Sequence, residues 1–220
     1  MKAVLLSACS NWCEKIVSGE ATVRACKSMP SIPTPFKCYI YCTKGKPFIQ
    51  KIRFGDIAIS NTQISNNLYN GKVIGEFVCD WIAEFDCELY NDGSDEEIRS
   101  VWYDEDDGER YTEIIARTGN HSWLSRHACI SWDEFKAYMG EGEKTFYGWH
   151  ISDLKIYDKP KELSGFFTVK YDNVDYCIGC PHHETSVREY PCCECVDEVG
   201  NRKYLSRPPQ SWMYVQESEE

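Results

Sequence analysis

One stretch near the N-terminus decides the fold: Lys2-Ala-Val-Leu-Leu-Ser7, then Asn11-Trp-Cys-Glu-Lys-Ile-Val-Ser18 with Gly19-Glu20, then Ala21-Thr-Val-Arg-Ala-Cys-Lys27. The apolar first segment predicts a buried strand. Ser10 or Asn11 can cap a short helix that runs to Ser18, and Gly19 supplies the left-handed residue that ends it. A short strand is predicted at Thr22–Ala25. The helix and the ends of both strands are therefore expected to face one cleft.

Strands are predicted along much of the remaining chain. Alternating apolar residues indicate them over Phe36–Cys42 and Lys72–Cys79. Strand is also expected from Phe146 to Tyr157, before Pro160 ends it, and a last strand follows the stiff Pro-Pro pair at residue 208. Residues 44–70 show no sustained period and are expected to form a loop or a hairpin insertion.

The middle of the chain is acidic. Residues 84–128 look irregular, and the sequence predicts an insertion there with one helix over Asp95–Trp102. The following Ser131-Trp-Asp-Glu134 matches a capping box, which predicts a helix to Met139 that stops at Gly140.

Several short strands with few helices favour a small, strongly curved sheet. The predicted fold class is α+β, a small mixed or antiparallel β-barrel with a few flanking helices and irregular insertions. We expect the barrel domain over residues 1–165, with insertions at about 44–70 and 84–128. A cysteine-rich knuckle is expected over 166–205, and residues 206–220 are expected to hold a C-terminal strand that returns to the barrel, followed by a tail.

The charge of the chain is uneven. The net charge is −11, yet residues 1–53 carry nine Lys/Arg against two Glu, whereas residues 54–115 carry sixteen Asp/Glu against three basic residues. The acidic total therefore does not exclude a phosphate-bearing partner, because the local field matters more than the sum. No apolar run reaches membrane-spanning length, and no secretion signal is recognised, so we expect a soluble cytoplasmic protein without a membrane partner.

Thirteen cysteines in such a chain indicate thiols or metal ligands rather than disulfides. Two Cys-x-x-Cys pairs lie eleven residues apart, a spacing that suits tetrahedral zinc. The predicted ligands of this structural zinc are Cys177, Cys180, Cys192 and Cys195. Competing ligands are His182, His183 and Cys193, and the alternative is a flexible loop with free thiols.

Three motifs carry a family resemblance: Ser18-Gly19-Glu20, Gly71-Lys-Val-Ile-Gly-Glu-Phe77 and Phe146-Tyr-Gly-Trp-His-Ile151. In this order they resemble an ASCH domain, a member of the PUA-like β-barrel superfamily. Two longer strings resemble uncharacterised ASCH-like proteins of bacterial prophages: Tyr147-Gly-Trp-His-Ile-Ser-Asp-Leu-Lys-Ile-Tyr-Asp-Lys-Pro160 and Arg207-Pro-Pro-Gln-Ser-Trp212. The resemblance covers nearly the whole chain. It implies a PUA-like barrel whose cleft, beside the first helix, receives RNA, a nucleotide or a modified base.

The chain departs from the family inside that cleft. One branch of the family hydrolyses N4-acylated cytidine with a lysine, a threonine and a glutamate. Ala21 stands where the lysine belongs, Arg24 where a glutamate belongs and Cys26 where an arginine belongs. Thr22 alone is a weak nucleophile without a base, so the family's hydrolysis is not expected and no catalytic residue is predicted.

Nine residues are predicted to line the cleft. Arg24 and Lys27 would hold a phosphate or a polar base edge, and Trp12 or Trp149 would stack on a base, although a core position for Trp149 is equally consistent with the pattern. The predicted set is Ser7, Cys9, Ser10, Trp12, Thr22, Arg24, Cys26, Lys27 and Trp149. The predicted function is therefore binding of a nucleotide, a modified nucleoside or RNA.

Two other functions remain open. One is an amidohydrolase that acts on an acylated nucleoside through a rearranged site. The other is a phage-type inhibitor or interaction module, in which the acidic 84–113 segment contacts a protein partner.

Overall fold

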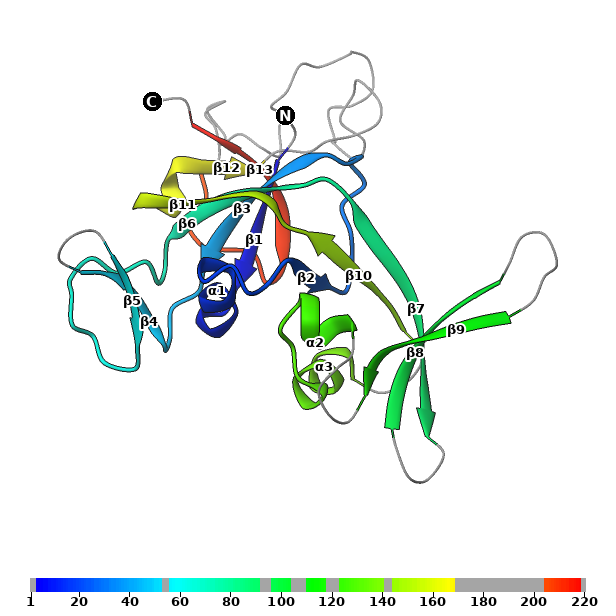
Figure 1. Ribbon diagram of the computed structural model, residues 1–220. Helices are drawn as coiled ribbons and strands as arrows, with labels where there is room; N and C mark the ends of the chain where they lie inside the picture. The colour runs from blue at the N-terminus through cyan, green and yellow to red at the C-terminus, as the bar shows by residue number, and fades with distance from the viewer. Residues whose placement is uncertain are drawn as a thin grey trace, which may run out of the picture. The chain divides into compact units, whose positions relative to one another are not determined.

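The computed structural model describes residues 3–52, 56–91, 96–103, 110–117, 123–140, 144–168 and 204–218. The chain divides into two compact units. Unit 1 contains Met1–Glu14, Phe36–Val78 and Asp153–Glu220, and unit 2 contains Lys15–Pro35 and Cys79–Ser152. Figure 1 labels the elements of both.

Unit 1 is built on a six-stranded mixed sheet with the order β11-β6-β3-β1-β13-β12 (Figure 1). β1 runs parallel to β3 and antiparallel to β13, so the last strand of the chain lies beside the first. The strands are β1 (Ala3–Ala8), β3 (Phe36–Cys42), β6 (Val73–Cys79), β11 (Ser152–Lys161), β12 (Phe166–Thr168) and β13 (Trp212–Glu217). A 3-10 turn, η2 (Leu163–Gly165), precedes β12.

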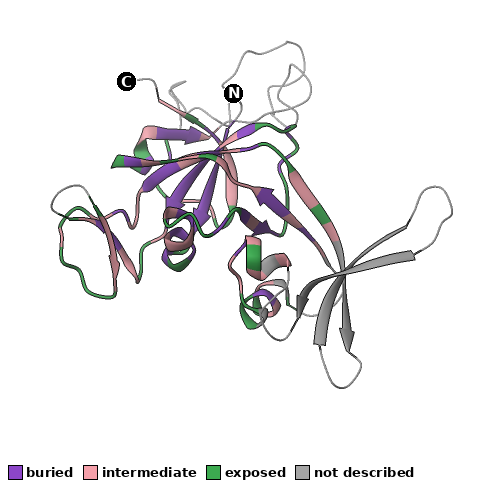
Figure 2. Cartoon of the chain, in the orientation of Figure 1, coloured by how far each residue is buried: buried purple, intermediate pink, exposed green. Residues whose placement is uncertain are grey.

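The core of unit 1 lies at the centre of this sheet. All six residues of β1 are buried, as the purple strands of Figure 2 show, which explains why its sequence is an apolar run without alternation. One apolar cluster joins Leu5, Tyr39, Phe166 and Val215 from four different strands. Burial of such side chains supplies the main driving force for folding.

The expected loop or hairpin at residues 44–70 is a two-stranded antiparallel sheet, β4 (Phe48–Lys51) with β5 (Ile57–Ser60), followed by a long loop. The buried side-chain amide of Gln50 organises that loop. It accepts hydrogen bonds from the backbone N–H groups of Ile64 (2.9 Å) and Ser65 (3.0 Å) and donates to the carbonyl of Thr62 (2.9 Å).

Unit 2 is built on a five-stranded antiparallel sheet with the order β2-β10-β7-β8-β9. Its core joins Ala25, Ala128, Phe135 and Phe146. The strands are β2 (Val23–Cys26), β7 (Ile82–Asn91), β8 (Glu96–Tyr103), β9 (Arg110–Arg117) and β10 (Lys144–His150). The helices are α2 (Trp123–His127) and α3 (Trp132–Met139), while α1 (Ser10–Val17) begins in unit 1 and ends in unit 2.

Both ends of α3 and the glycine that ends α1 follow the sequence prediction, whereas the Ser10 hydroxyl, a predicted cap of α1, donates to the Lys46 carbonyl instead. Ser131 caps α3, accepting a hydrogen bond from the Glu134 backbone, and the Glu134 carboxylate accepts one from the Ser131 backbone. Gly19 and Gly140 have φ values of 76° and 78°, the left-handed conformation that glycine adopts without steric penalty.

Two local predictions are wrong. The segment expected to be a helix at Asp95–Trp102 lies largely in β8, because its β-branched and aromatic residues suit a strand and two neighbouring strands satisfy its backbone. Pro160 does not end β11, which continues to Lys161. β11 is the edge strand of its sheet, where the missing N–H of proline leaves no partner unsatisfied.

The predicted α+β class, with mixed and antiparallel sheets and a few helices, is confirmed. The described strands form three separate sheets, and their pairing does not close a barrel. Among the helices that the structure describes, none has the length and apolar character needed to cross a membrane.

Candidate functional site

Four predicted cleft residues lie in unit 1. Ser7, at the end of β1, is buried, and its Oγ has no hydrogen-bond partner among the described residues. Cys9 is exposed at the start of α1, where its carbonyl accepts hydrogen bonds from the first turn of the helix. Ser10 is buried and donates to the carbonyl of Lys46 at 2.5 Å, and Trp12 is buried.

The other five predicted residues lie in unit 2, so the nine are divided between the units and a common cleft stays a prediction. Arg24 faces Trp149 across the β2–β10 pair, Thr22 is exposed, and the ammonium of Lys27 lies 4.7 Å from the ring centroid of Tyr138.

Two predicted roles are corrected by burial. Trp149 is fully buried and has no exposed face for stacking. Burial raises the pKa of the Cys26 thiol to about 11, although Arg24 lowers it, so this cysteine is a neutral core residue.

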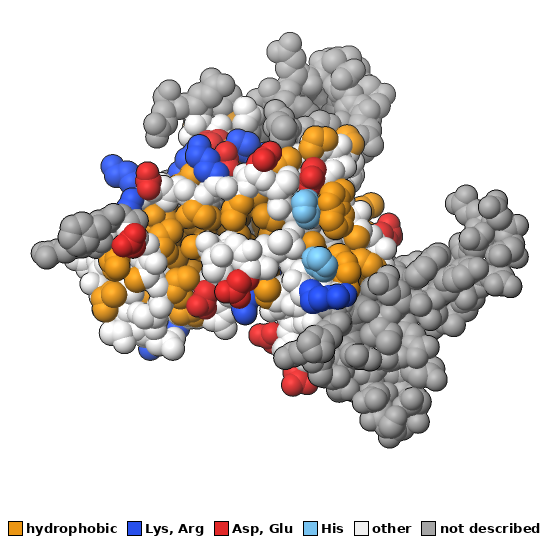
Figure 3. All heavy atoms as spheres, viewed as in Figure 1, with side chains coloured by type: hydrophobic (Ala, Val, Ile, Leu, Met, Phe, Trp, Pro, Cys, Tyr) orange, Lys and Arg blue, Asp and Glu red, His pale blue; other side chains and the backbone are white. Residues whose placement is uncertain are grey.

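An exposed aromatic pair in unit 2 was not predicted. The rings of Trp81 and His150 stack with centroids 4.7 Å apart and an interplanar angle of 13°. Trp81 keeps 40% of its surface exposed, whereas Phe135, Phe146 and Trp149 of the same unit are fully buried. Histidine side chains (pale blue) lie at the surface beside hydrophobic side chains in Figure 3.

The strand register creates this pair. The backbone N–H of His150 donates to the carbonyl of Trp81 at 3.2 Å, where β7 and β10 come together, so both rings project from the same face of the sheet. The residue before Trp81 adds a charge. Asp80 Oδ1 lies 2.6 Å from Nδ1 of His150, and this hydrogen bond, helped by one from Ser152, lowers the pKa of Asp80. The site therefore combines an aromatic surface with an ionised carboxylate, and 43% of that side chain is exposed.

A second group of rings lies on Gly148 of β10. A Cβ at this glycine would meet Trp123 Cη2 at 3.1 Å, so the absence of a side chain makes room for the indole. Trp123 also contacts Phe85 and His127, with centroids 5.0 Å apart in each case. The Nδ1 atom of His127 lies 3.4 Å from Oγ1 of Thr22, and the Thr22 backbone N–H donates to the His127 carbonyl at 2.8 Å. No base beside Thr22 was predicted from the sequence, because Thr22 and His127 are 105 positions apart in the chain.

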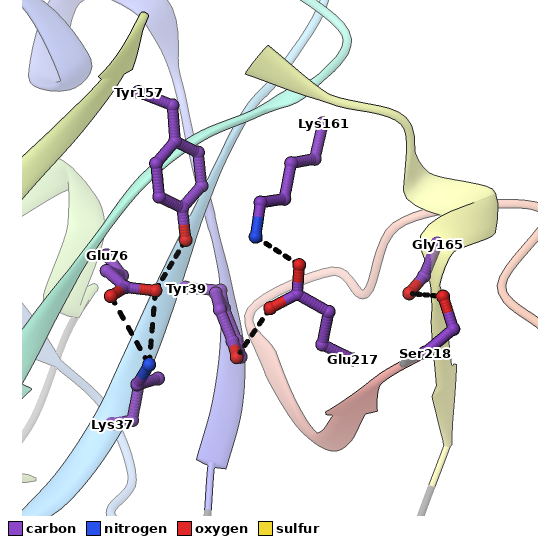
Figure 4. Close-up of polar contacts among 8 residues, drawn as sticks. All are labelled: Lys37, Tyr39, Glu76, Tyr157, Lys161, Gly165, Glu217 and Ser218. Carbon is purple, nitrogen blue, oxygen red and sulfur yellow. Dashed lines mark hydrogen bonds and ion pairs between the residues drawn. The ribbon is translucent and has the colours of Figure 1, made fainter. Parts of the chain in front are cut away.

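Unit 1 carries a half-buried network of two carboxylates on its six-stranded sheet (Figure 4). Tyr157 donates to Glu76 at 2.5 Å, and Lys37 lies 3.3 Å from both oxygens of the same carboxylate. Glu217 is held in the same manner by Tyr39, at 3.1 Å, and by Lys161. Each carboxylate is thus satisfied by one tyrosine and one lysine, which makes the network a brace across four strands.

The zinc prediction falls outside the described residues. Within the part of the chain that the structure describes, no group of three or more His, Cys, Asp or Glu side chains could hold a metal ion. The predicted zinc ligands Cys177, Cys180, Cys192 and Cys195 all lie in residues 169–203, which are not described.

Comparisons with known proteins give matches only among solved structures. No model of a protein family matches the sequence, and no curated protein matches it. The crystal structure of ASCH from Zymomonas mobilis is 17% identical, covers 74% of this chain and 74% of its own, and has a TM-score of 0.42. A tyrosine-to-phenylalanine mutant of the same protein is 16% identical, covers 74% of this chain and 77% of its own, and has a TM-score of 0.41.

These solved structures come from the family that the sequence motifs resemble. At identities of 16–17% and TM-scores of 0.41–0.42, nothing about a ligand or an activity of this chain follows from the likeness. The residues of this chain carry the functional argument.

Proposed function

We propose that this chain binds a nucleobase, in a nucleotide, a modified nucleoside or a segment of RNA, on the exposed Trp81–His150 pair. The observation that carries the proposal is the stacked geometry of these two rings with Trp81 left 40% exposed. Bases stack on aromatic side chains irrespective of sequence, because every base has a π-face.

Asp80 gives the aromatic pair a means of discrimination. Its carboxylate, held by His150 at 2.6 Å and partly exposed, can accept a hydrogen bond from an exocyclic amino group or a ring N–H of a base. An ionised carboxylate repels phosphate, however, so we expect the base and not the backbone to make the main contact at this position. Lys27 and Thr22 remain proposed contacts for the polar parts of the ligand. Arg24 pairs with Trp149, on the face of the sheet opposite to His150, so it stays a proposed contact of the originally predicted cleft and not of this aromatic pair.

Titration with nucleosides tests this proposal, since these ligands carry a base and no phosphate. Isothermal titration calorimetry should detect binding of cytidine, adenosine and N4-acetylcytidine to the intact protein, and it measures the Kd of variants that lack Trp81 as well. Loss of one stacking contact costs about 1–3 kcal/mol, so Trp81→Ala should raise the Kd about 5- to 150-fold, whereas Trp81→Phe should restore much of the affinity.

The matched control is Tyr204→Ala, which removes another exposed ring (49%) and should leave the Kd unchanged. Equal affinity of Trp81→Ala and the unsubstituted protein for every nucleoside would refute the proposed site.

One observation favours hydrolysis of an acylated nucleoside as a second candidate. The Thr22 hydroxyl lies 3.4 Å from His127 Nδ1, a distance from which a small movement forms a nucleophile–base pair. Thr22 Oγ1 would attack the acyl carbonyl while His127 takes its proton. The proton then passes to the departing amine, and water hydrolyses the threonyl ester.

Chromatography of N4-acetylcytidine after incubation tests this candidate. Release of cytidine that is lost in both Thr22→Ala and His127→Gln would support it, and the absence of turnover by the unsubstituted protein would refute it. The result is independent of the stacking test, because binding needs no chemistry.

Two further proposals concern parts of the chain outside the site. A structural zinc held by the four cysteines of the knuckle would let a short segment fold without its own core. The acidic 84–113 segment is proposed to bind a protein partner. Loss of an activity when its carboxylates are neutralised, with nucleoside binding intact, would support this proposal.

A further inference from the structure

Unit 1 contains a cavity of about 500 Å³ whose lining includes none of the residues of the candidate site in unit 2. Its walls come from the end of β4, the loop before β6 and the end of β11. Three lysines line it, Lys51, Lys72 and Lys159, with Asn66, Asn67 and Asp158 as further polar groups. A volume of this size suits a small-molecule ligand.

The walls of the cavity are held rigidly. The amide of Asn70 accepts a hydrogen bond from the Ile49 N–H (2.8 Å) and donates to the carbonyls of Gly45 and Pro47 (both 3.0 Å). The buried hydroxyl of Tyr69 donates to the carbonyl of Tyr157 at 2.9 Å, which ties the loop to β11. With the Gln50 amide described above, these contacts fix the loop before any ligand arrives, which reduces the entropy lost on binding.

The charges in the cavity favour an anion. Lys51 lies 3.1 Å from Asp158 Oδ1, and Lys72 lies 2.7 Å from Glu162. Lys159 is exposed and has no recorded partner among the described residues. Because the Asp158 side chain is 99% exposed, it can swing into solvent and release Lys51 to an incoming anion at little cost.

We propose that this cavity binds a phosphorylated small molecule of about the size of a pentose phosphate or a mononucleotide. Lys159 and Lys51 hold the phosphate, and the Asn66 and Asn67 side chains provide donors and acceptors for the neutral hydroxyl groups of the ligand. The site is separate from the nucleobase pair in unit 2 and stands whether or not that pair binds a base.

Calorimetry with ribose 5-phosphate, ribose and inorganic phosphate tests this inference on the full chain. None of these probes carries a base, so none of them can bind by stacking on the Trp81–His150 pair. We expect ribose 5-phosphate to bind, ribose not to bind, and inorganic phosphate to bind more weakly. A hydrogen bond to a charged group is worth about 1.5–3 kcal/mol, so Lys159→Gln should weaken ribose 5-phosphate binding by at least about tenfold.

Two variants distinguish specific binding in the cavity from non-specific binding of the phosphate to surface lysines. Lys155→Gln removes an exposed lysine of the same strand that does not line the cavity, and it should leave the affinity unchanged. Asp158→Asn removes the competitor for Lys51 and should tighten binding. Equal weakening by Lys155→Gln and Lys159→Gln would overturn the proposal, and so would the absence of ribose 5-phosphate binding by the folded, unsubstituted protein.

Discussion

Replacing Tyr157 by phenylalanine probes the brace across the unit 1 sheet. The substitution removes one hydroxyl, which donates to Glu76 at 2.5 Å, and keeps the ring on which Lys161 rests, 4.6 Å from its centroid. No cavity forms, so the effect reports the hydrogen bond alone. Burial raises the pKa of Tyr157, and its bond to the Glu76 carboxylate raises it further, so the hydroxyl is protonated and is the donor at neutral pH.

The magnitude follows from the chemistry of the acceptor. A hydrogen bond to a charged group contributes about 1.5–3 kcal/mol. The Glu76 side chain keeps 20% of its surface exposed and retains Lys37, so water and the lysine replace part of the lost contact. We therefore expect Tyr157→Phe to lower the free energy of unfolding by about 1.5–2 kcal/mol at pH 7.

The pH dependence gives this prediction a second test. Burial alone would raise the pKa of Glu76, but the hydrogen bonds from Tyr157 and Lys37 outweigh it and lower the pKa from its ordinary value of 4.5. A lowered folded-state pKa contributes stability that is present above the ordinary value and lost as the pH falls through the folded-state value. The penalty of Tyr157→Phe should therefore be largest near neutral pH and shrink near pH 4.

Urea unfolding followed by tryptophan fluorescence, at pH 7 and near pH 4, measures both quantities. The control is Tyr204→Phe, since Tyr204 is 49% exposed and should lose less than about 0.5 kcal/mol. A loss below about 0.5 kcal/mol for Tyr157→Phe at pH 7, or a penalty that grows in acid, would refute the reasoning.

Three further predictions concern packing, capping and metal. Gly75→Ala places a Cβ 2.5 Å from the Lys155 carbonyl of the neighbouring strand, so it should lower the unfolding free energy by about 3 kcal/mol or more. Gly165→Ala, whose Cβ would meet only Ser218 Oγ at an ordinary contact distance of 4.0 Å, should have little effect in the same urea titration. Ser131→Ala removes the cap of α3 and should lose about 1 kcal/mol; an unchanged midpoint would contradict the capping role. Native mass spectrometry should find one zinc ion per chain that a chelator removes. A metal-free mass before chelation would contradict the prediction that the four cysteines hold zinc.

Short-range features were predictable from neighbouring residues. The α3 cap needs only Ser131 and Glu134, three residues apart, and the end of α1 needs only a glycine at position 19. Strand β3 appears with the predicted bounds, because its alternation is local. The helix expected at Asp95–Trp102 failed for the opposite reason: strand pairing with residues elsewhere in the chain decided the structure there.

The candidate site depends mostly on residues that are far apart in the chain, so most of it could not be predicted from the sequence. A tryptophan in the sequence carries no sign of its exposure. From the sequence, Trp149 was a predicted stacking residue and Trp81 was not, yet Trp149 is fully buried and Trp81 is 40% exposed. The Asp80–His150 pair, 70 positions apart, meets only when the ends of β7 and β10 come together. The Thr22–His127 pair, 105 positions apart, meets only when the end of α2 lies beside the residue before β2.

The sequence by itself determined the first strand, helix and glycine stop and the capping box, because each depends on residues close together in the chain. The α+β class and the resemblance to ASCH domains also followed from the sequence, through the order of short segments along it. The tertiary structure alone decided which aromatic rings face water, which thiol is buried and which lysines surround a cavity. Exposure and proximity are products of strand register and packing, and residues far apart in the chain jointly set both.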